Sequence, residues 1–333
     1  MSTTPSPSEL RVDPLTGLRT IVAAGRATRP GAGLEITPPP KIADEQDPFA
    51  EGHEDQTPPE LYAVRPDGGE PDSPGWVVRV VPNRYPAVTP DAPEPEREHA
   101  DADLFTALAA RGCQEVIVNA PQSVATLAEL APAQVVAAME VWRERIRHHA
   151  GAACVHVLVN ERAEAGASLA HTHAQLYALE FVPAAVARER ERFYAYATRT
   201  MGANLLADLV QAEVRIARRI VAIDEEAVLM CPYGARVPFQ MLLVPRQPRA
   251  RFEDDGPLGA ALLHDALGRL SRALGASPPL NLWVRTAPRG AEQFCWRIDV
   301  LPRLGQPAGL ELGTGVNVNI VAPEDAAARL REA

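Results

Sequence analysis

The chain has 333 residues, of which 46% are hydrophobic and 23% charged, the balance of a globular protein with one large domain or two of ordinary size. Its formal net charge of −10 argues against nucleic-acid and membrane partners, so an anionic substrate would have to be bound by local arginines. No apolar run reaches the roughly 18 residues of a membrane span, and the first residues, MSTTPSPSEL, lack a secretory pattern. Four scattered cysteines without CxxC spacing indicate reduced thiols, and we expect a cytoplasmic protein.

The first half of the chain predicts short strands, one long loop and one helix. A Pro-Leu-Thr-Gly turn precedes a short apolar strand, IVAA, and the Pro-rich, acidic residues 36–60 predict a long loop. Further strands are expected in GWVVRVVPNRYPAV (75–88), QEVIVNAP (114–121) and CVHVLVNE (154–161). PAQVVAAMEVWRERIRHHAG (132–151) has helical apolar spacing and a basic last turn, where His148 and His149 are expected to be solvated.

The second half repeats this plan after a charged helical segment from Pro183 to about Ala222. VPFQMLLVPRQPRARFEDD (237–255) resembles residues 114–130, because both read strand, proline and entry to a helix. The helix LGAALLHDALGRLSRALGA follows, and residues 281–304 then parallel residues 156–183 as strand, loop and strand. These parallels predict an internal duplication. On the overlay, Cys295, Arg297 and Asp299 occupy the places of His171, His173 and Gln175.

Two histidines and a glutamine alternate within the apolar run GASLAHTHAQLYALEFVP, residues 166–183. Side chains two positions apart on a strand point to the same face, so His171, His173 and Gln175 are expected to line one surface. Burying three polar groups side by side without partners costs free energy, which favours a functional role for them.

The preceding loop, NERAEAGAS, has the composition of an anion-binding loop. Gly166 and small side chains let backbone N–H groups approach an anion, and the Ser168 hydroxyl adds a donor. Imidazole is a good nucleophile at neutral pH and can carry a phosphoryl group as a phosphoramidate. The pattern favours covalent transfer of a nucleotidyl group on a histidine, with the Gln175 amide stabilising charge on the phosphoryl oxygens.

Two simpler interpretations of these histidines stay open at this stage. A strand histidine can be a structural residue of the core. Two histidines at i and i+2 can also be metal ligands, although the same short span supplies no third ligand or carboxylate.

Motifs in a defined order cover nearly the whole chain: DPLTG…GRATRP, TPPE, PNRYPA, N…AGASLAHTHAQ and LPRLGQPAGLELGTGVNVN…PEDAA. They resemble the galactose-1-phosphate uridylyltransferase family, a transferase branch of the histidine-triad superfamily, and its ADP-glucose phosphorylase relatives. The resemblance implies an α+β fold of two fused histidine-triad-like units, each an antiparallel sheet flanked by helices. Residues 1–190 would hold the catalytic His-x-His-x-Gln, and residues 191–333 a degenerate copy of the site.

The resemblance also implies a ping-pong reaction and a set of site residues. His173 would attack the α-phosphorus of a nucleotide sugar, His171 matches the histidine before the nucleophile, and Gln175 matches the glutamine that binds the nucleotide phosphate. The substrate-binding positions implied are Arg26, Arg29, Asn83, Asn160, Gly166, Ser168, Glu311, Gly313 and Gly315. The segment from Glu311 to Gly315 matches one that a neighbouring subunit contributes, which implies a homodimer. Simpler alternatives are solvated arginines, a turn asparagine and a plain Gly-rich loop.

The chain departs from the family at a structural metal site. Many members bind a metal through Cys-Pro-Phe-Cys, where this chain has Asp47, Pro48, Phe49 and Ala50. Ser123 stands in place of a further histidine ligand, and His171 is all that is left of the set. One histidine and one aspartate cannot form a closed four-ligand zinc site, so we expect no zinc there.

A second family metal site is also altered. Glu189 is kept, but the other ligand positions are Arg285, Arg297 and Asp299. We expect no metal and no other cofactor in this protein. The hypothesis is that an ion-pair cluster replaces the metal, and the alternative is four unrelated surface charges.

The function expected from these features is nucleotidyl transfer between a nucleotide sugar and a sugar 1-phosphate. Three alternatives stay open: a phosphorylase that uses inorganic phosphate, a non-catalytic nucleotide-sugar binding protein, and a hydrolase. Glutamine at position 175 disfavours rapid hydrolysis, because it has no titratable proton to give to a leaving group. No residue distinguishes one base or one sugar from another.

Overall fold

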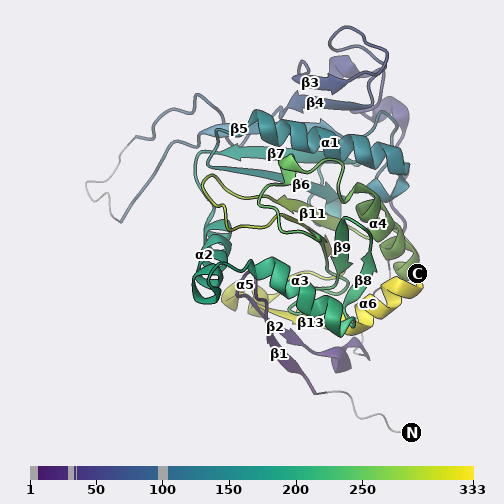
Figure 1. Cartoon of the computed structure of the whole chain (residues 1–333). Helices are drawn as coiled ribbons and strands as arrows, with labels where there is room; N and C mark the ends of the chain where they lie inside the picture. Colours follow the sequence, from purple (N-terminus) through teal and green to yellow (C-terminus); the bar gives the residue numbers. More distant parts are fainter. Residues whose placement is uncertain (1–6, 29–33, 35, 97–103) are drawn as a thin grey trace.

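The computed structural model describes residues 7–28, 34, 36–96 and 104–333, and its centre is a single sheet of ten strands (Figure 1). Every neighbouring pair in this sheet is antiparallel. In spatial order the strands are β3 (Tyr62–Val64), β4 (Val78–Pro82), β5 (Gly112–Val118), β7 (His173–Leu179), β6 (Cys154–Glu161), β11 (Leu280–Arg285), β12 (Arg297–Pro302), β10 (Met241–Pro245), β9 (Ala227–Met230) and β8 (Ile220–Ile223). The expectation of a mixed α+β protein with antiparallel sheets is confirmed.

The strand order of the second half repeats that of the first half, read from the opposite edge of the sheet. The first five strands lie in the order β3-β4-β5-β7-β6, and the last five, from the far edge inwards, in the order β8-β9-β10-β12-β11. A long helix follows the third strand of each set, α1 (Pro132–His148) after β5 and α4 (Ala260–Leu274) after β10. Strands β6 and β11 pair at the junction, so the sheet is continuous across both halves.

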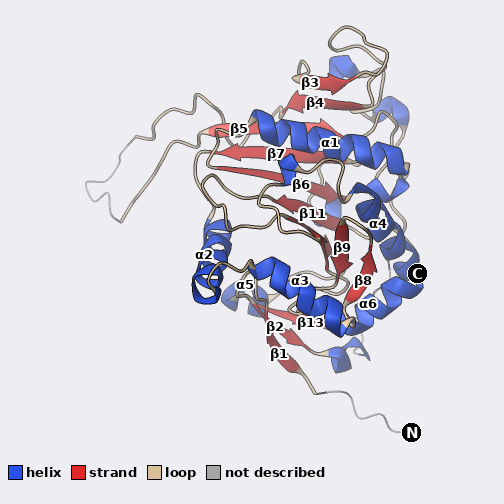
Figure 2. Cartoon of the chain, viewed as in Figure 1, coloured by secondary structure: helices blue, strands red, loops and turns tan. Residues whose placement is uncertain are grey.

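One face of the sheet is covered by α1, α4 and the last helix, α6 (Pro323–Glu332) (Figure 2). Alternate strand residues point to this face because the side-chain period of a strand is two. Val157, Leu176 and Leu282 therefore join the largest hydrophobic core. Helix α1 begins at Pro132, whose fixed φ and missing N–H suit the first helical position.

The opposite face is partly covered by α2 (Ala184–Thr200) and α3 (Leu205–Ile216). Phe193 and Leu206 from these helices pack against Met230 and Leu242 of the sheet in a second hydrophobic core. The Asn204 side chain caps α3 by accepting hydrogen bonds from two backbone N–H groups. These helices lie over the β8–β10 end. At β4 and β5 the same face is covered by loop residues, because Phe49 and Trp76 pack against Val81, Val116 and Val118.

A small three-stranded sheet joins the two ends of the chain (Figure 1). It contains β1 (Glu9–Val12), β2 (Arg19–Val22) and β13 (Val316–Asn319), and β2 and β13 are parallel. The segment from Glu311 to Gly315, for which a plain Gly-rich loop was the simpler alternative, lies in and beside the short helix α5 (Gly309–Thr314). None of the helices in the described part of the chain combines the length and the apolar character needed to cross a membrane.

Candidate active site

A cavity of about 380 Å³ lies between this face of the sheet and residues of the segment 48–58, and its size is typical of small-molecule sites. Four positions that the sequence marked as site residues line it together: Asn83, Ser168, His173 and Gln175. The other lining residues are Pro48, Phe49, Gln56, Thr57, Pro58, Val81, Pro82, Arg84, Tyr85, Val116 and Leu169. Segments more than one hundred residues apart in sequence thus meet at one apolar cavity with a few polar groups.

His173, the first residue of β7, is buried at this cavity with its protonation state set by the backbone. Its Nδ1 lies 2.7 Å from the carbonyl oxygen of His171. A carbonyl can only accept, so Nδ1 carries the proton and Nε2 keeps its lone pair. Burial lowers the pKa of His173 from its ordinary value, so the ring is a neutral imidazole near pH 7. The Phe49 ring packs edge-on against it, with ring centroids 5.3 Å apart.

The amide of Gln175 is oriented by its neighbours on the sheet. The Gln114 amide nitrogen donates to Gln175 Oε1 at 3.1 Å, and the Tyr177 hydroxyl lies 3.4 Å from the same oxygen. With its oxygen engaged, Gln175 has its NH₂ group available to a ligand in the cavity. Such a donor is suited to a phosphoryl oxygen.

His171 lies outside strand β7 and does not line the cavity. The strand begins two residues later, and the His171 ring turns to the Asp47 carboxylate, 2.6 Å from Nδ1, and to the Ala120 carbonyl oxygen, 2.9 Å from Nε2. Both ring nitrogens therefore face hydrogen-bond acceptors, and the Asp47 carboxylate lies within ion-pair distance of the ring. Burial alone would raise the pKa of Asp47, but the hydrogen bond and charge of His171 outweigh it and lower that pKa. The expected common face therefore holds for His173 and Gln175 only.

The loop between β6 and β7 is held in an unusual backbone conformation. Arg162 has φ of 73° and Gly166 has φ of 93°. A positive φ is costly for a side chain such as that of Arg162, and it is found where surrounding contacts impose it. Here the Arg162 guanidinium donates to the Thr37 and Ser277 carbonyl oxygens. Asn160, at the end of β6, accepts a hydrogen bond from Asn281 of the second half at 2.8 Å.

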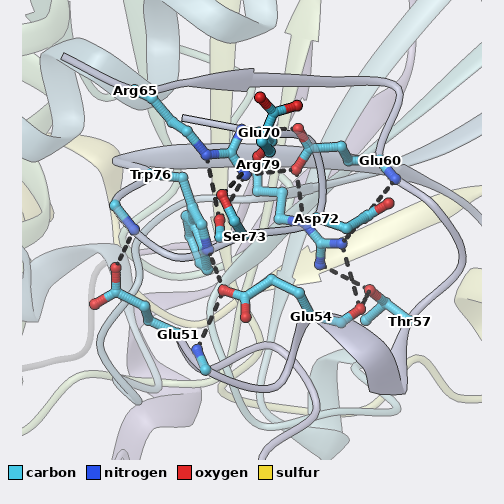
Figure 3. Close-up of polar contacts among 12 residues, drawn as sticks. Glu51, Glu54, Thr57, Glu60, Arg65, Glu70, Asp72, Ser73, Trp76 and Arg79 are labelled. Carbon is cyan, nitrogen blue, oxygen red and sulfur yellow. Dashed lines mark hydrogen bonds and ion pairs between the residues drawn. The ribbon is translucent and has the colours of Figure 1, made fainter. Parts of the chain in front are cut away.

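A buried polar network supports the part of the cavity wall that Thr57 forms, and Figure 3 shows the members of the network. Arg79, 2% exposed, donates to Thr57 Oγ1 at 2.7 Å, to Asp72 Oδ1 at 2.5 Å and to Glu60 Oε2 at 3.2 Å. Glu60 also accepts two hydrogen bonds from the guanidinium of Arg65. Since Thr57 itself lines the cavity, this network fixes part of the wall to strand β4.

Several predicted substrate-binding positions lie away from this cavity. Arg26 is exposed in the turn after β2, and Glu311, Gly313 and Gly315 lie in and beside α5. The Glu311 carboxylate accepts a hydrogen bond from the Ala308 N–H at 2.9 Å. Arg29 falls outside the described residues.

Eleven of the fifteen lining residues were not among the predicted site residues, and three of them, Phe49, Thr57 and Arg84, are of functional interest. Thr57 is the first residue of TPPE, and Arg84 follows Asn83 in PNRYPA. Phe49 stands in the segment Asp47-Pro48-Phe49-Ala50, whose sequence signal is the absence of the family's two metal-binding cysteines. Proximity to a motif was the available signal for Arg84, whose guanidinium suits a phosphate.

Within the described ranges, one group could offer three ligands to a metal: Cys113, Glu115 and His149. Arg145 already donates to both Glu115 oxygens, at 2.8 and 2.6 Å. Burial would lower the pKa of His149, but hydrogen bonds with Cys113 and Glu115 raise it to about 9. The expectation that His149 is solvated is wrong, because its side chain is 15% exposed and lies 2.7 Å from Glu115. The group is arranged as an ion-pair cluster.

The altered second metal position is also an ion-pair cluster. Arg297 Nη2 lies 2.9 Å from Glu189 Oε2, Arg285 Nε lies 3.4 Å from the same oxygen, and Arg297 Nε lies 3.0 Å from Asp299 Oδ2. Glu189, Arg297 and Asp299 are all buried. The alternative of four unrelated surface charges is therefore wrong.

The fold and the cavity together define an α+β protein with a neutral, buried histidine facing a ligand-sized pocket. Residues 2–183 match the family model of the galactose-1-phosphate uridyl transferase N-terminal domain, and residues 129–333 match a domain of unknown function. The first match covers more than half of the chain. The chain belongs to the galactose-1-phosphate uridylyltransferase family.

Individual relatives of known name extend over almost the whole chain. An ADP-glucose phosphorylase of Arabidopsis thaliana is 27% identical over 97% of this chain and 92% of the relative. A galactose-1-phosphate uridylyltransferase of Haemophilus influenzae is 28% identical over 96% of this chain and 93% of the relative. The crystal structure of the Arabidopsis thaliana ADP-glucose phosphorylase with bound ADP-glucose superimposes with a TM-score of 0.80, at 25% identity over 98% and 99% of the two chains. These relatives are enzymes of nucleotide-sugar metabolism.

Proposed function

We propose that this protein is a nucleotidyltransferase that moves a nucleoside monophosphate from a nucleotide sugar to a phosphate acceptor through a nucleotidyl-His173 intermediate. The observation that carries the proposal is the 2.7 Å contact between His173 Nδ1 and the His171 carbonyl oxygen. It leaves Nε2 unprotonated at a cavity that Ser168 and Gln175 also line. A neutral imidazole so placed is a competent nucleophile.

The proposed reaction needs no proton transfer at the histidine. Nε2 attacks the α-phosphorus, an N–P bond forms, and the P–O bond to the sugar phosphate breaks with its electron pair leaving on oxygen. The nucleotidyl-imidazolium keeps its Nδ1 proton, and the His171 carbonyl dipole stabilises the positive charge. In the second half-reaction a phosphate oxygen of the acceptor attacks the same phosphorus, and neutral imidazole leaves.

Donors around the cavity fit the charge that develops on the phosphoryl oxygens. We assign this role to the Gln175 amide and the Ser168 hydroxyl, with Asn83 binding the nucleotide. Asn160 and Gly166 would shape the loop that carries Ser168. His171 is a positioning residue: its pairing with Asp47 holds the carbonyl that orients His173.

The acceptor separates the two leading candidates. The uridylyltransferase relatives favour a sugar 1-phosphate, and the similarity to ADP-glucose phosphorylase favours inorganic phosphate. The second candidate function is therefore a nucleotide-sugar phosphorylase with the same covalent intermediate.

Intact-mass spectrometry after incubation with a panel of nucleotide sugars tests the intermediate. The protein should gain the mass of one nucleoside monophosphate, and the gained mass identifies the base. His173→Ala should gain none, whereas His264→Ala, which removes a histidine of helix α4, should behave as the wild type. Discharge of the labelled protein by a sugar 1-phosphate favours the transferase, and discharge by inorganic phosphate alone favours the phosphorylase. Tight binding of a nucleotide sugar without any mass gain would refute catalysis through His173.

We further propose that the two halves are fused histidine-triad-like units, with residues 1–190 catalytic and residues 191–333 degenerate. The repeated strand order and the position of α1 and α4 support a duplication. Strand β12 begins at Arg297 as β7 begins at His173, which agrees with the overlay of the two motifs.

A homodimer and the absence of bound metal complete the proposal. Glu311, Gly313 and Gly315 lie outside the cavity of their own chain, so they would reach the sugar site of a partner. Sedimentation should give a dimer. Elemental analysis that finds stoichiometric zinc or iron in purified protein would contradict the metal-free proposal.

A further inference from the structure

A second cavity, of about 270 Å³, lies on the same face of the sheet as the catalytic cavity, but over β11 and β12. Register places Trp283 of β11 beside Leu158 of β6, which in turn lies beside Gln175 of β7. Two strand spacings of about 4.8 Å therefore separate Trp283 from Gln175. The residues that line the second cavity are Thr16, Leu18, Ala185, Arg188, Glu189, Arg236, Trp283, Arg285, Arg297 and Asp299. None of these lines the catalytic cavity.

The charged residues of this second cavity leave an excess of positive charge. It is lined by four arginines and two carboxylates, a formal balance of 4 − 2 = +2. The carboxylates of Glu189 and Asp299 are engaged by Arg285 and Arg297. The excess then rests on the other two arginines, in a molecule whose net charge is −10. A local positive site in an acidic protein attracts anions.

The two remaining arginines have no acidic partner among the residues that the structure describes. Arg188 is exposed on α2, and no ion pair involves it within the described ranges. Arg236 is half-buried, and its guanidinium lies 5.7 Å from the centre of the Trp283 ring. Both guanidinium groups are therefore available to an anion.

Buried donors in the cavity also lack hydrogen-bond acceptors in the described part of the chain. Arg297 is 1% exposed, and its Nη1 has no partner. The indole Nε1 of Trp283 is likewise buried without a partner. Buried N–H groups normally donate a hydrogen bond, and a buried donor that lacks an acceptor costs free energy. An oxygen-rich anion would supply the missing acceptors.

The first turn of α2 adds a further favourable element. Ala185 of this turn lines the cavity, the helix has no side-chain cap, and its first turn holds no acidic residue. The first backbone N–H groups of a helix lack intrahelical acceptors, and the helix dipole favours negative charge near them.

We propose that this arginine pocket binds a phosphate-class oxyanion, either as inorganic phosphate or as the phosphate group of a small monoester. A tetrahedral dianion offers acceptors to donors that converge from β11, β12 and α2. The excess of two positive charges matches its charge. The inference does not depend on the proposed nucleotidyl transfer, because no residue is shared between the two cavities.

Isothermal titration of the full chain with inorganic phosphate, and separately with glycerol 3-phosphate, tests the proposal. We expect saturable binding of one anion at this pocket, weakened at least about tenfold in the Arg188→Gln/Arg236→Gln variant, because hydrogen bonds to charged groups are strong. Arg215→Gln, a matched exposed arginine on α3, should bind as the wild type. Tighter binding of phosphate than of the ester would indicate the free ion as ligand, and the reverse order would indicate a monoester.

A second pair of variants avoids any change to the ion-pair cluster. Ala185 is exposed, and a carboxylate in the first turn of a helix stabilises the helix, so Ala185→Asp should fold normally. It should abolish anion binding by repulsion, whereas the neutral Ala185→Asn should keep it. Ser168→Ala/Gln175→Ala, in the catalytic cavity, should also keep it. Absence of saturable binding to the wild type overturns the proposal. The proposal is also overturned if Ala185→Asp still binds the anion and Ser168→Ala/Gln175→Ala does not.

Discussion

The carboxyl group of Glu161 gives a quantitative prediction about stability and pH. Glu161 ends strand β6, is 3% exposed, and accepts one hydrogen bond from the Leu127 backbone N–H. Burial raises its pKa from 4.5 to about 8, the Leu127 hydrogen bond opposes the shift, and the charge of Glu129 adds to it. The folded protein therefore holds this proton at neutral pH, whereas the unfolded chain releases it above about pH 4.5.

The sign of the pH dependence follows from the proton count. Between the unfolded and folded pKa values the folded state binds one more proton, so the free energy of unfolding falls as pH rises and levels off above about pH 8. At about 1.36 kcal/mol per pKa unit, a shift from 4.5 to about 8 corresponds to an upper bound of about 5 kcal/mol. We expect about 2–4 kcal/mol once the protein relaxes around the charge.

Glu161→Gln removes the titration and keeps an acceptor for the Leu127 N–H. The variant should match the wild type within about 1 kcal/mol near pH 5 and exceed it by about 2–4 kcal/mol near pH 8, measured by urea unfolding. Glu225→Gln, at an exposed position, is the matched control and should show no such trend. A difference between Glu161→Gln and the wild type that is the same at both pH values would refute the reasoning.

Three further predictions concern buried ion pairs. Asp47→Asn removes the buried carboxylate that contacts His171 Nδ1, so unfolding should become easier by about 3 kcal/mol and nucleotidylation should slow, as followed by denaturant titration and intact mass. Arg79→Met leaves the carboxylates of Glu60 and Asp72 without this positive partner. The free energy of unfolding should fall by about 3–5 kcal/mol in the same titration, and nucleotide sugar should bind more weakly. His149 has a raised pKa of about 9, so its pairing with Glu115 stabilises the fold fully below about pH 6.5, and the stabilisation is lost as pH rises through about 9. The gap in stability between wild type and His149→Gln should close over that range, and a gap that persists above it would contradict the assignment.

Local sequence patterns predicted most of the central sheet and its main helices. Alternating apolar and β-branched residues predicted β6 over its full extent, Cys154–Glu161. Helical apolar spacing that begins with a proline predicted the start of α1 at Pro132. The site histidine and glutamine were also predictable, since an i, i+2 pair of polar side chains in an apolar strand already implies a shared face. These features depend on neighbours within a few residues.

Features that depend on distant residues were not predictable in the same way. His171 was expected on the strand face, but Asp47, more than one hundred positions away, draws it out of the strand. His149 was expected in solvent, because no residue near it in sequence indicates that Glu115 of β5 contacts the C-terminal end of α1. Short strands such as β8 and β9 pair only within the completed sheet, so tertiary context outweighs their weak local signal.

Side chains at the two cavities are held in different charge states on one face of the sheet, His173 neutral and Arg297 positively charged. At the start of β7, a backbone carbonyl and burial keep His173 neutral, which a nucleophile requires. At the equivalent start of β12, Glu189 and Asp299 outweigh the cost of burial and raise the pKa of Arg297, so its guanidinium stays charged. A neutral imidazole can form and break a bond to phosphorus, whereas a guanidinium can only hold an oxyanion. Under the proposed duplication, arginine in place of histidine would change the available chemistry from the proposed transfer to the binding of an anion, while each side chain is presented at the start of a strand.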